Sequence, residues 1–259
     1  MKQSERAGAF RAMHHEPPVL VLANAWDVAS AVLVASLPGC RALATSSAGC
    51  AAVLGYPDGE RIPAAEMLEL VARIARAVEL PVTADLEAGY GDPAGTASAA
   101  WGIGVVGLNL EDGDGDPDAH VERVRAVRDA VPELVINARV DRFLLGDGDL
   151  DEALRRAALY LEAGADCIFV PGVVDALTIG RLADGIGGPL NVLAGPATPP
   201  VAELERLGVA RVSVGSGLMR AVAGDARRRA GAILSAGRFD VLDGAVGFEE
   251  LGELLEPGL

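Results

Sequence analysis

The sequence is poor in aromatic residues and in positive charge. Only 4% of its 259 residues are Phe, Trp or Tyr although 51% are hydrophobic, and 22 Lys and Arg residues face 37 Asp and Glu residues, a formal net charge of −15. The apolar residues are therefore mainly aliphatic, which favours a repetitive interior of strands and helices and excludes intrinsic disorder. Because so acidic a surface repels a phosphate backbone, we expect no nucleic-acid partner.

Long apolar runs are also missing. Runs such as Ala29–Leu37 are too short to cross a bilayer, and the first six residues lack the apolar segment of a signal peptide. We therefore expect a soluble, cytoplasmic protein that does not associate with membranes.

Cysteine and histidine are rare as well. Cys40, Cys50 and Cys167 have no CxxC spacing and stand in apolar surroundings, so we expect buried thiols rather than disulfides or a zinc site. The three histidines lie away from predicted strand ends, which predicts surface positions for them and no catalytic triad.

Short apolar runs alternate with longer amphipathic stretches eight times along the chain. The predicted strands are Val19–Ala25, Arg41–Ser46, Pro81–Leu86, Val105–Leu110, Leu134–Val140, Cys167–Pro171, Leu190–Leu193 and Arg211–Gly215. The predicted helices are Val28–Leu37, Ala64–Val78, Pro93–Trp101, Pro117–Val131, Leu150–Ala163, Ala176–Gly185, Pro200–Leu207 and Gly217–Ala236. Several strands are apolar throughout, which is typical of parallel sheets that are buried on both faces.

Eight such units without a linker between them predict one (β/α)8 TIM barrel over residues 1–259, an α/β fold. A doubly wound nucleotide-binding sheet is disfavoured because no G-x-G-x-x-G follows the first strand. Residues 239–259 form a C-terminal extension with an amphipathic segment, Phe248–Leu255, that packs either under the barrel or on a partner subunit.

Polar residues stand at most of the predicted strand ends, where a barrel builds its active site. Asp85 and Glu87 would point to one face if their strand stayed extended through both, and Glu111 ends the neighbouring strand. Three converging carboxylates call for a raised pKa or a bound hard cation, and all-oxygen ligands suit Mg²⁺ or Mn²⁺. Alternatively, Glu87 or Glu111 pairs with Arg139 or caps a helix.

Arg139, at the end of the fifth strand, is suited to bind a substrate carboxylate through its planar guanidinium, although it could also be a structural counter-ion. The small residues Ser46, Ser47, Ala48 and Gly49 would let backbone N–H groups approach a substrate closely.

Several of these stretches resemble the isocitrate lyase and phosphoenolpyruvate mutase superfamily in order and strand placement. The matching stretches are Asn24-Ala25-Trp26-Asp27, Thr45-Ser46-Ser47-Ala48-Gly49, Leu54-Gly55-Tyr56-Pro57-Asp58, Ala84-Asp85-Leu86-Glu87-Ala88-Gly89-Tyr90-Gly91, Asn109-Leu110-Glu111-Asp112, Asn137-Ala138-Arg139-Val140-Asp141 and Ile168-Phe169-Val170-Pro171-Gly172, with Asn191 and Val212-Ser213-Val214-Gly215 similar in the last two strands.

The resemblance implies a Mg²⁺-dependent barrel that acts on a small 2-oxo acid or dicarboxylate through an enolate. It makes Asp85 the direct metal ligand, with Asp58, Glu87 and Glu111 holding metal-bound waters, and it gives Asp58, Glu111 and Arg139 catalytic roles. The substrate-binding residues that it implies are Trp26, Ser46, Ser47, Ala48, Asp85, Arg139 and Asn191. It also implies a homo-oligomer, a dimer or tetramer that exchanges its last helix.

The sequence departs from the family in two places. Glu87 stands where the family usually has Asp, which we interpret as variation. The loop after Glu111 is Asp112-Gly113-Asp114-Gly115-Asp116, without the Cys, Lys and His of the lyases. A retro-aldol cleavage needs such acid–base groups, and three aspartates would repel a phosphoryl group.

We therefore expect a carbon–carbon lyase or decarboxylase of an oxaloacetate-like acid. The alternatives are phosphoenolpyruvate mutase or phosphonopyruvate hydrolase chemistry at a P–C bond, or a barrel that binds a 2-oxo acid without catalysis.

Overall fold

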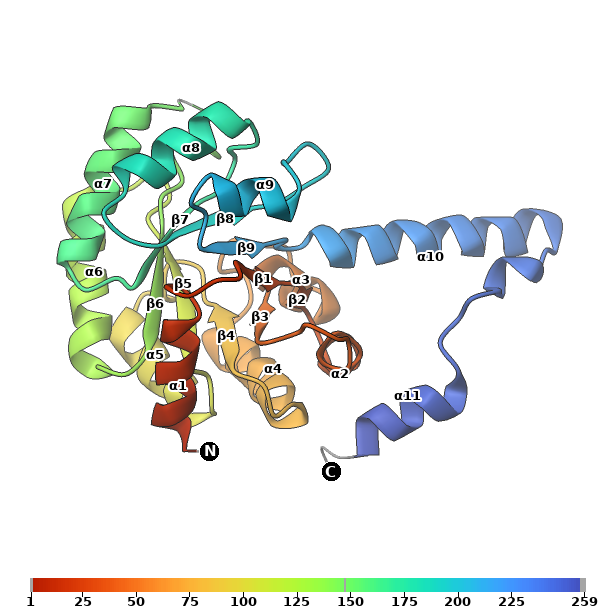
Figure 1. Cartoon of the computed structure of the whole chain (residues 1–259). Coiled ribbons are helices and arrows are strands. Elements are labelled where there is room, and N and C mark those ends of the chain that lie inside the picture. The colour runs from red at the N-terminus through yellow and green to blue at the C-terminus, as the bar shows by residue number, and fades with distance from the viewer. Residues whose placement is uncertain (1, 147, 257–259) are drawn as a thin grey trace.

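The computed structural model describes residues 2–146 and 148–256, and its centre is a parallel barrel ringed by helices (Figure 1). Every pair of neighbouring strands is parallel, in the order β1-β9-β8-β7-β6-β5-β4-β3-β2. Only Ala23 separates β1 from β2, so these two are halves of one strand and the sheet returns on itself. The strands are β1 Leu20–Leu22, β2 Asn24–Ala25, β3 Leu43–Thr45, β4 Val82–Asp85, β5 Gly107–Glu111, β6 Val135–Arg139, β7 Cys167–Val170, β8 Leu190–Leu193 and β9 Arg211–Ser213.

The prediction of a (β/α)8 barrel is confirmed, and each of the eight predicted helices is present. These helices are α2 Val28–Ala35, α4 Ala64–Ala77, α5 Pro93–Gly102, α6 Pro117–Ala130, α7 Leu150–Glu162, α8 Ala176–Gly185, α9 Val201–Arg206 and α10 Gly217–Ala236. The sequence analysis did not predict two further helices, α1 Gln3–Ala12 and α3 Ser47–Val53. After α10 come the 3₁₀ turn η1 Asp240–Leu242 and the helix α11 Phe248–Leu255.

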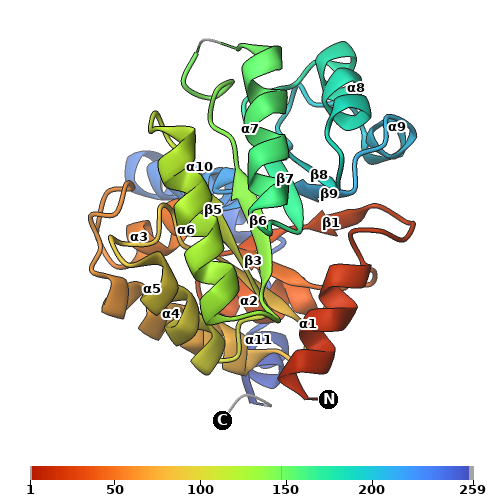
Figure 2. The same ribbon diagram turned by 90° about the vertical axis from the view of Figure 1, so that its left-hand side faces the viewer.

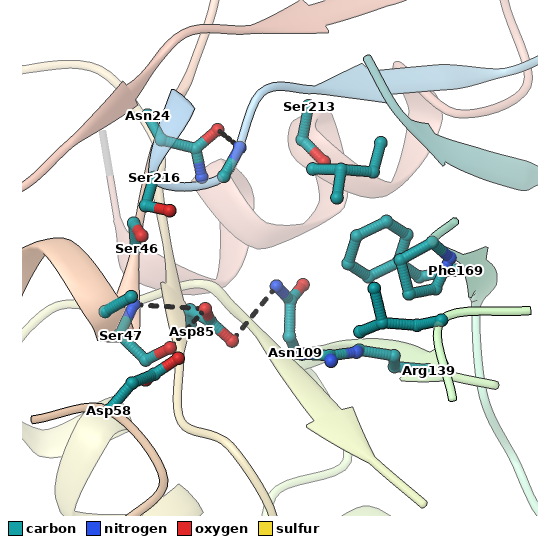
Figure 3. Close-up of a pocket in the computed structure, with 15 residues that line it drawn as sticks. Asn24, Ser46, Ser47, Asp58, Asp85, Asn109, Arg139, Phe169, Ser213 and Ser216 are labelled. Carbon is teal, nitrogen blue, oxygen red and sulfur yellow. Dashed lines mark hydrogen bonds between the residues drawn. The ribbon is translucent and has the colours of Figure 1, made fainter. Parts of the chain in front are cut away.

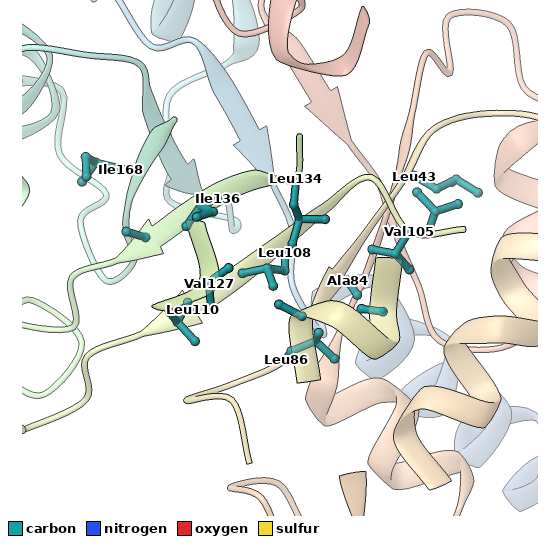
Figure 4. Packing of buried hydrophobic residues seen from close by; sticks show 14 of the residues in the cluster. Leu43, Ala84, Leu86, Val105, Leu108, Leu110, Val127, Leu134, Ile136 and Ile168 are labelled. Carbon is teal, nitrogen blue, oxygen red and sulfur yellow. The ribbon is translucent and has the colours of Figure 1, made fainter. Parts of the chain in front are cut away.

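The main core lies between the strands and the surrounding helices. Leu108 and Leu110 of β5, Ile136 of β6 and Val127 of α6 are buried in one cluster (Figure 4). Fully apolar strands fit this arrangement because the outer face of the sheet is covered by helices and the inner face by the barrel interior. Burying a side chain of this size contributes about 1.5–3 kcal/mol.

Helix α1 lies across the amino-terminal end of the barrel, opposite the strand ends that carry the site (Figure 2). Phe10 is fully buried in a second cluster with residues of the barrel interior. A Cβ on Gly107 would lie 2.9 Å from Cε1 of Phe10, so β5 can approach α1 this closely only with glycine there. Nε of Arg11 donates to Oδ1 of Asp166 at 2.7 Å and fixes the other side of the helix.

The predicted surface positions of the histidines are wrong for His14 and His120, which are 4% and 0% exposed. His120 shares the buried face of α6 with Val121, Val124 and Val127, and its ring packs edge-on against Tyr160. The cysteine prediction agrees better with the structure, because all three thiols are free and Cys50 and Cys167 are buried, whereas Cys40 is half-buried.

Helix α10 leaves the barrel and projects into solvent, and none of its residues is buried (Figure 1). The chain then turns back, and α11 contacts α2 of the same chain, with Leu254 and Leu255 against the main core. Phe239 and Phe248 of this C-terminal part are 68% and 95% exposed. No helix in the described part of the chain is long and apolar enough to span a membrane.

Candidate active site

A pocket of about 180 Å³ opens at the carboxyl ends of the strands (Figure 3). A cavity of this size has room for a small organic acid. Most of its lining residues are polar, and its larger apolar ones are Leu144, Phe169, Pro171 and Leu193. The lining residues are Asn24, Ser46, Ser47, Ala48, Asp58, Asp85, Asn109, Arg139, Leu144, Phe169, Pro171, Leu193, Ser213, Gly215 and Ser216.

Asp85, the last residue of β4, is the best-fixed carboxylate of the pocket. Its Oδ2 accepts hydrogen bonds from the backbone N–H and the hydroxyl of Ser47, at 3.0 and 2.8 Å. Its Oδ1 accepts one from Nδ2 of Asn109 at 3.3 Å (Figure 3). These contacts hold the carboxylate in one orientation and leave lone pairs on both oxygens.

The small residues after β3 form the beginning of α3. Ser46 is its N-cap, and its hydroxyl accepts from the backbone N–H of Gly49 at 3.3 Å. A Cβ on Gly49 would lie 2.8 Å from Cβ of Trp26, so α3 packs closely on the end of the first strand. Asn24 joins the end of the first strand to the segment after β9, because its Oδ1 accepts from the backbone N–H groups of Val214 and Gly215, both at 2.9 Å.

Glu87 does not follow the alternation of an extended strand. The strand ends at Asp85, and Glu87 has a φ of 51°, in the left-handed region. Its carboxylate accepts from the backbone N–H of Glu60 at 2.6 Å and from the Tyr90 hydroxyl at 3.0 Å. Burial raises the pKa of Glu87, these two hydrogen bonds lower it, and the nearby charges of Asp58 and Asp85 raise it.

Arg139 and Glu111 form an ion pair of 2.5 Å between Nη1 and Oε2, which is the alternative that the sequence left open. Nε of Arg139 also donates to Oδ1 of Asp141 at 2.6 Å. The pKa of Glu111 is raised from 4.5 to about 7, because burial raises it more than the charge of Arg139 lowers it and the charge of Asp85 raises it as well. Arg139 therefore lines the pocket while two carboxylates hold it.

The three aspartates of the loop after β5 differ in their surroundings. Asp112 is 4% exposed and its Oδ2 accepts from Nη1 of Arg156 and from the Tyr160 hydroxyl, both at 2.7 Å. Asp116 is the N-cap of α6. Asp114 is exposed, and in the described part of the chain it neither caps a helix nor pairs with a cation. The argument that three aspartates repel a phosphoryl substrate is therefore wrong for Asp112, whose charge Arg156 compensates.

The structure brings most of the predicted site residues to the pocket. Ser46, Ser47, Ala48, Asp58, Asp85 and Arg139 line it, whereas Trp26, Glu87, Glu111 and Asn191 are not among the lining residues. Asn191 is fully buried, and its Oδ1 accepts from the Ser213 hydroxyl at 3.3 Å.

The residues that the site prediction missed are Asn24, Asn109, Leu144, Phe169, Pro171, Leu193, Ser213, Gly215 and Ser216. Most of them stand at or just after a strand end, and this placement could have identified them.

The donor set fits one hard cation that keeps most of its water. Within the described ranges, no three Asp, Glu, His or Cys residues are grouped closely enough to hold a metal directly. Asp85 and Asp58 both line the pocket, and the charge of Asp85 acts on Glu87 and Glu111. Mg²⁺ prefers such a site, with one or two carboxylates and several waters.

The chain is similar to several known proteins. A model of the phosphoenolpyruvate phosphomutase family matches residues 10–234. A protein of Mycobacterium tuberculosis is 36% identical over 214 residues, which are 80% of this chain and 82% of that protein. An oxaloacetate decarboxylase of Ectopseudomonas mendocina is 32% identical over 224 residues, with 79% and 76% of the two chains covered.

Among solved structures, a Burkholderia cenocepacia protein assigned as a lyase or mutase matches with a TM-score of 0.90 and 38% identity, over 97% of this chain and 96% of that one. Since the family model and these relatives match most of the sequence and the fold agrees, the protein belongs to the isocitrate lyase and phosphoenolpyruvate mutase superfamily.

Proposed function

We propose that the protein is a Mg²⁺-dependent carbon–carbon lyase that decarboxylates an oxaloacetate-like 2-oxo acid. One observation carries this proposal. Among the described residues that line the pocket, the ionisable side chains are Asp58, Asp85 and Arg139, and there is no Lys, His or Cys. A retro-aldol cleavage needs a base for the substrate hydroxyl, whereas loss of CO₂ from a 2-oxo acid does not.

The residues of the pocket bind the substrate and set its orientation. Arg139 receives a carboxylate, because its guanidinium is planar and carries several donors in a fixed geometry. The beginning of α3, with Ser46, Ser47 and Ala48, faces the same space and supplies hydroxyl and backbone donors. Leu144 and Phe169 add apolar surface to the pocket, and the Phe169 ring lies beside the Arg139 guanidinium.

Asp85 would hold the Mg²⁺, and Asp58, Glu87 and Glu111 would hold its water ligands. When bound, the ion supplies Lewis-acid polarisation of the oxo group, which favours departure of CO₂. In the reaction the bond between the β-carbon and its carboxyl carbon breaks, and the electron pair stays on the substrate as the enolate. Water then supplies the proton that gives the product 2-oxo acid.

The proposal is tested by following oxaloacetate loss with Mg²⁺, with EDTA, and with Mg²⁺ but no protein. We expect turnover well above the protein-free rate, lost with EDTA and in Asp85→Ala. Asp114→Ala, a change in the exposed part of the neighbouring loop, is the matched control and should keep wild-type turnover. If folded wild type turns over neither oxaloacetate nor related 2-oxo acids above the metal-only rate, the decarboxylase proposal is wrong.

Cleavage or migration at a P–C bond is the second candidate. It is favoured by the match to the phosphoenolpyruvate phosphomutase family model and by the compensated charge of Asp112, which removes one objection to a phosphoryl group. Phosphorus NMR with phosphonopyruvate distinguishes the two, because only P–C chemistry produces a new phosphorus resonance. A binding barrel without catalysis would show a thermal shift with oxalate and Mg²⁺ but no product in either assay.

The C-terminal part supports a homo-oligomeric assembly as part of this proposal. Helix α10 buries no residue, and Leu234, Phe239 and Phe248 are 87%, 68% and 95% exposed. Exposed apolar side chains along one arm are typical of a surface that a partner covers. Light scattering after size exclusion should show a dimer or tetramer, and Phe239→Asp should shift it toward the monomer; a monomeric wild type would contradict the assembly.

A further inference from the structure

The pocket arginine is oriented by contacts that lie outside the pocket. Two nitrogens of Arg139 are bound to carboxylates, Nε to Asp141 at 2.6 Å and Nη1 to Glu111 at 2.5 Å. The guanidinium carbon lies 6.0 Å from the centre of the Phe169 ring. Neither Asp141 nor Glu111 is among the lining residues. The orientation of the guanidinium is thus decided before a ligand arrives, and no described residue is hydrogen-bonded to Nη2, which is left for a ligand to reach.

Asp141 is itself held in place by the loop after β5. It is 2% exposed, and its Oδ2 accepts from the backbone N–H of Gly113 at 3.2 Å. Its own backbone N–H donates to Oδ1 of Asp112 at 2.9 Å. Asp141 is therefore held through its side chain by Gly113 and through its backbone by Asp112.

Asp112 is anchored from the barrel exterior by α7. Nη1 of Arg156 and the hydroxyl of Tyr160 both donate to Oδ2 of Asp112, each at 2.7 Å, and the side chain of Asp112 is completely buried. Arg156 is held in turn by Glu152 at 2.8 Å. One continuous line of contacts thus runs from α7 through two aspartates to the pocket arginine.

Two of the hydrogen bonds to the Asp112 carboxylate come from groups that can only donate, the Arg156 guanidinium on Oδ2 and the Asp141 backbone N–H on Oδ1, and a further one comes from the Tyr160 hydroxyl on Oδ2. A carboxylate satisfies all of them because both of its oxygens accept. An Asn amide would place its NH₂ against at least one donor, which costs a buried hydrogen bond and repels the donor. The chain therefore needs an acid here, and not merely a polar side chain.

We propose that Asp112, anchored by Arg156 and Tyr160, is a positioning residue that holds Asp141 and through it orients Arg139 to receive the substrate carboxylate. This proposal rests on the proposed function for the identity of the ligand. It assigns the loop after β5 a role in anion recognition that needs no proton transfer by the loop itself.

The test compares Asp112→Asn with a control at the opposite end of the barrel. Asp166 is similarly bound, by Nε of Arg11 at 2.7 Å, Nη2 of Arg128 at 2.6 Å and the backbone N–H of Ile136 at 2.8 Å. Asp166→Asn therefore breaks a comparable network without touching Arg139. Titration calorimetry with oxalate at saturating Mg²⁺, below the unfolding range of both variants, gives Kd.

We expect Asp112→Asn to raise the Kd of oxalate and the KM of oxaloacetate about tenfold or more while kcat changes much less. Tyr160→Phe, which removes one of the donors and keeps the ring, should have the same effect at a smaller size. Asp166→Asn should lower Tm and leave the Kd of oxalate within about twofold of the wild-type value. That change is well below the roughly tenfold rise expected for Asp112→Asn. Equal Kd in Asp112→Asn and wild type, or an equal rise in Asp166→Asn, would overturn the positioning role.

The NMR signal of the Arg139 Nε–H group gives a readout that needs no substrate. It should move in Asp112→Asn, because its acceptor Asp141 shifts, and stay in place in Asp166→Asn. An unmoved signal in folded Asp112→Asn overturns the proposal. If the signal moves but wild type binds no oxalate and turns over no 2-oxo acid, the proposed function fails while the positioning of Arg139 by Asp112 stands.

Discussion

Acidification should destabilise the protein through a histidine that is buried without charge. His120 is 0% exposed, and neither ring nitrogen has a hydrogen-bond partner among the described residues. Burial, and then the charges of Arg123 and Arg156, lower its pKa from 6.5 to about 3. Between these two values the unfolded chain binds a proton that the folded chain does not, so stability is fully present above pH 6.5 and falls as the pH drops toward 3.

The magnitude follows from the two pKa values. At pH 7.5 both states carry a neutral ring and the difference is close to zero. At pH 5 an unfolded His120 is almost fully protonated, which costs the folded state about 2 kcal/mol at about 1.4 kcal/mol per pH unit. A folded pKa of about 4 instead of about 3 would change this figure by less than about 0.1 kcal/mol.

The assay is urea unfolding at pH 7.5, 6 and 5 at one protein concentration, since assembly would make stability depend on concentration. Between pH 7.5 and 5, His120→Leu should lose about 2 kcal/mol less than wild type. The comparison removes the contributions of His14 and of Glu111, which are common to both proteins. His15→Leu, a change at an exposed histidine, is the control and should follow wild type. Parallel curves for wild type and His120→Leu would refute the reasoning.

Three further outcomes are expected. Leu182→Ala in the buried face of α8 should reduce the free energy of unfolding by about 2–5 kcal/mol, whereas Leu177→Ala on the exposed face of the same helix should change it by less than about 0.5 kcal/mol; equal effects would contradict the described core. A thiol reagent should modify Cys40 first in the folded protein and reach the other two cysteines only after unfolding, because burial raises their pKa to about 12. Gly49→Ala should weaken oxalate binding in calorimetry because its Cβ would displace Trp26 or the start of α3, and an unchanged Kd would show that this corner is adaptable.

The barrel was predictable from the sequence because its strands are buried on both faces. Runs such as Ile168-Phe169-Val170 show this directly, and the observed β7, Cys167–Val170, differs from the predicted range by one residue. The helix α3 was missed because its seven residues, Ser47–Val53, are small and lack an amphipathic pattern. Helix α1 was missed for a different reason, since only Ala7 and Phe10 of its ten residues are buried.

The site was predictable in its location and less so in its contacts. Strand-end position identified Asp85 and Arg139, because the carboxyl ends of parallel strands meet at one mouth. The left-handed backbone of Glu87 and the pairing of Glu111 with Arg139 depend on contacts between distant segments, which periodicity does not encode. The burial of His120 could have been found, because it stands four residues before Val124 and seven before Val127 on an apolar helix face.

The pairing of β1 with β9 means that the barrel can close only late in synthesis of the chain. Leu20 pairs with Arg211 and Leu22 with Ser213, so this edge of β1 has no native partner until β9 has been synthesised. At ~5–20 residues per second on the ribosome, the roughly 190 residues between them take ~10–40 s to emerge. During that time β1 has an unpaired edge, and β8 has one for the roughly 20 residues that separate it from β9, and the free backbone groups of both edges can pair with other nascent chains. The soluble yield of the protein therefore depends on how well those two edges are protected until β9 emerges.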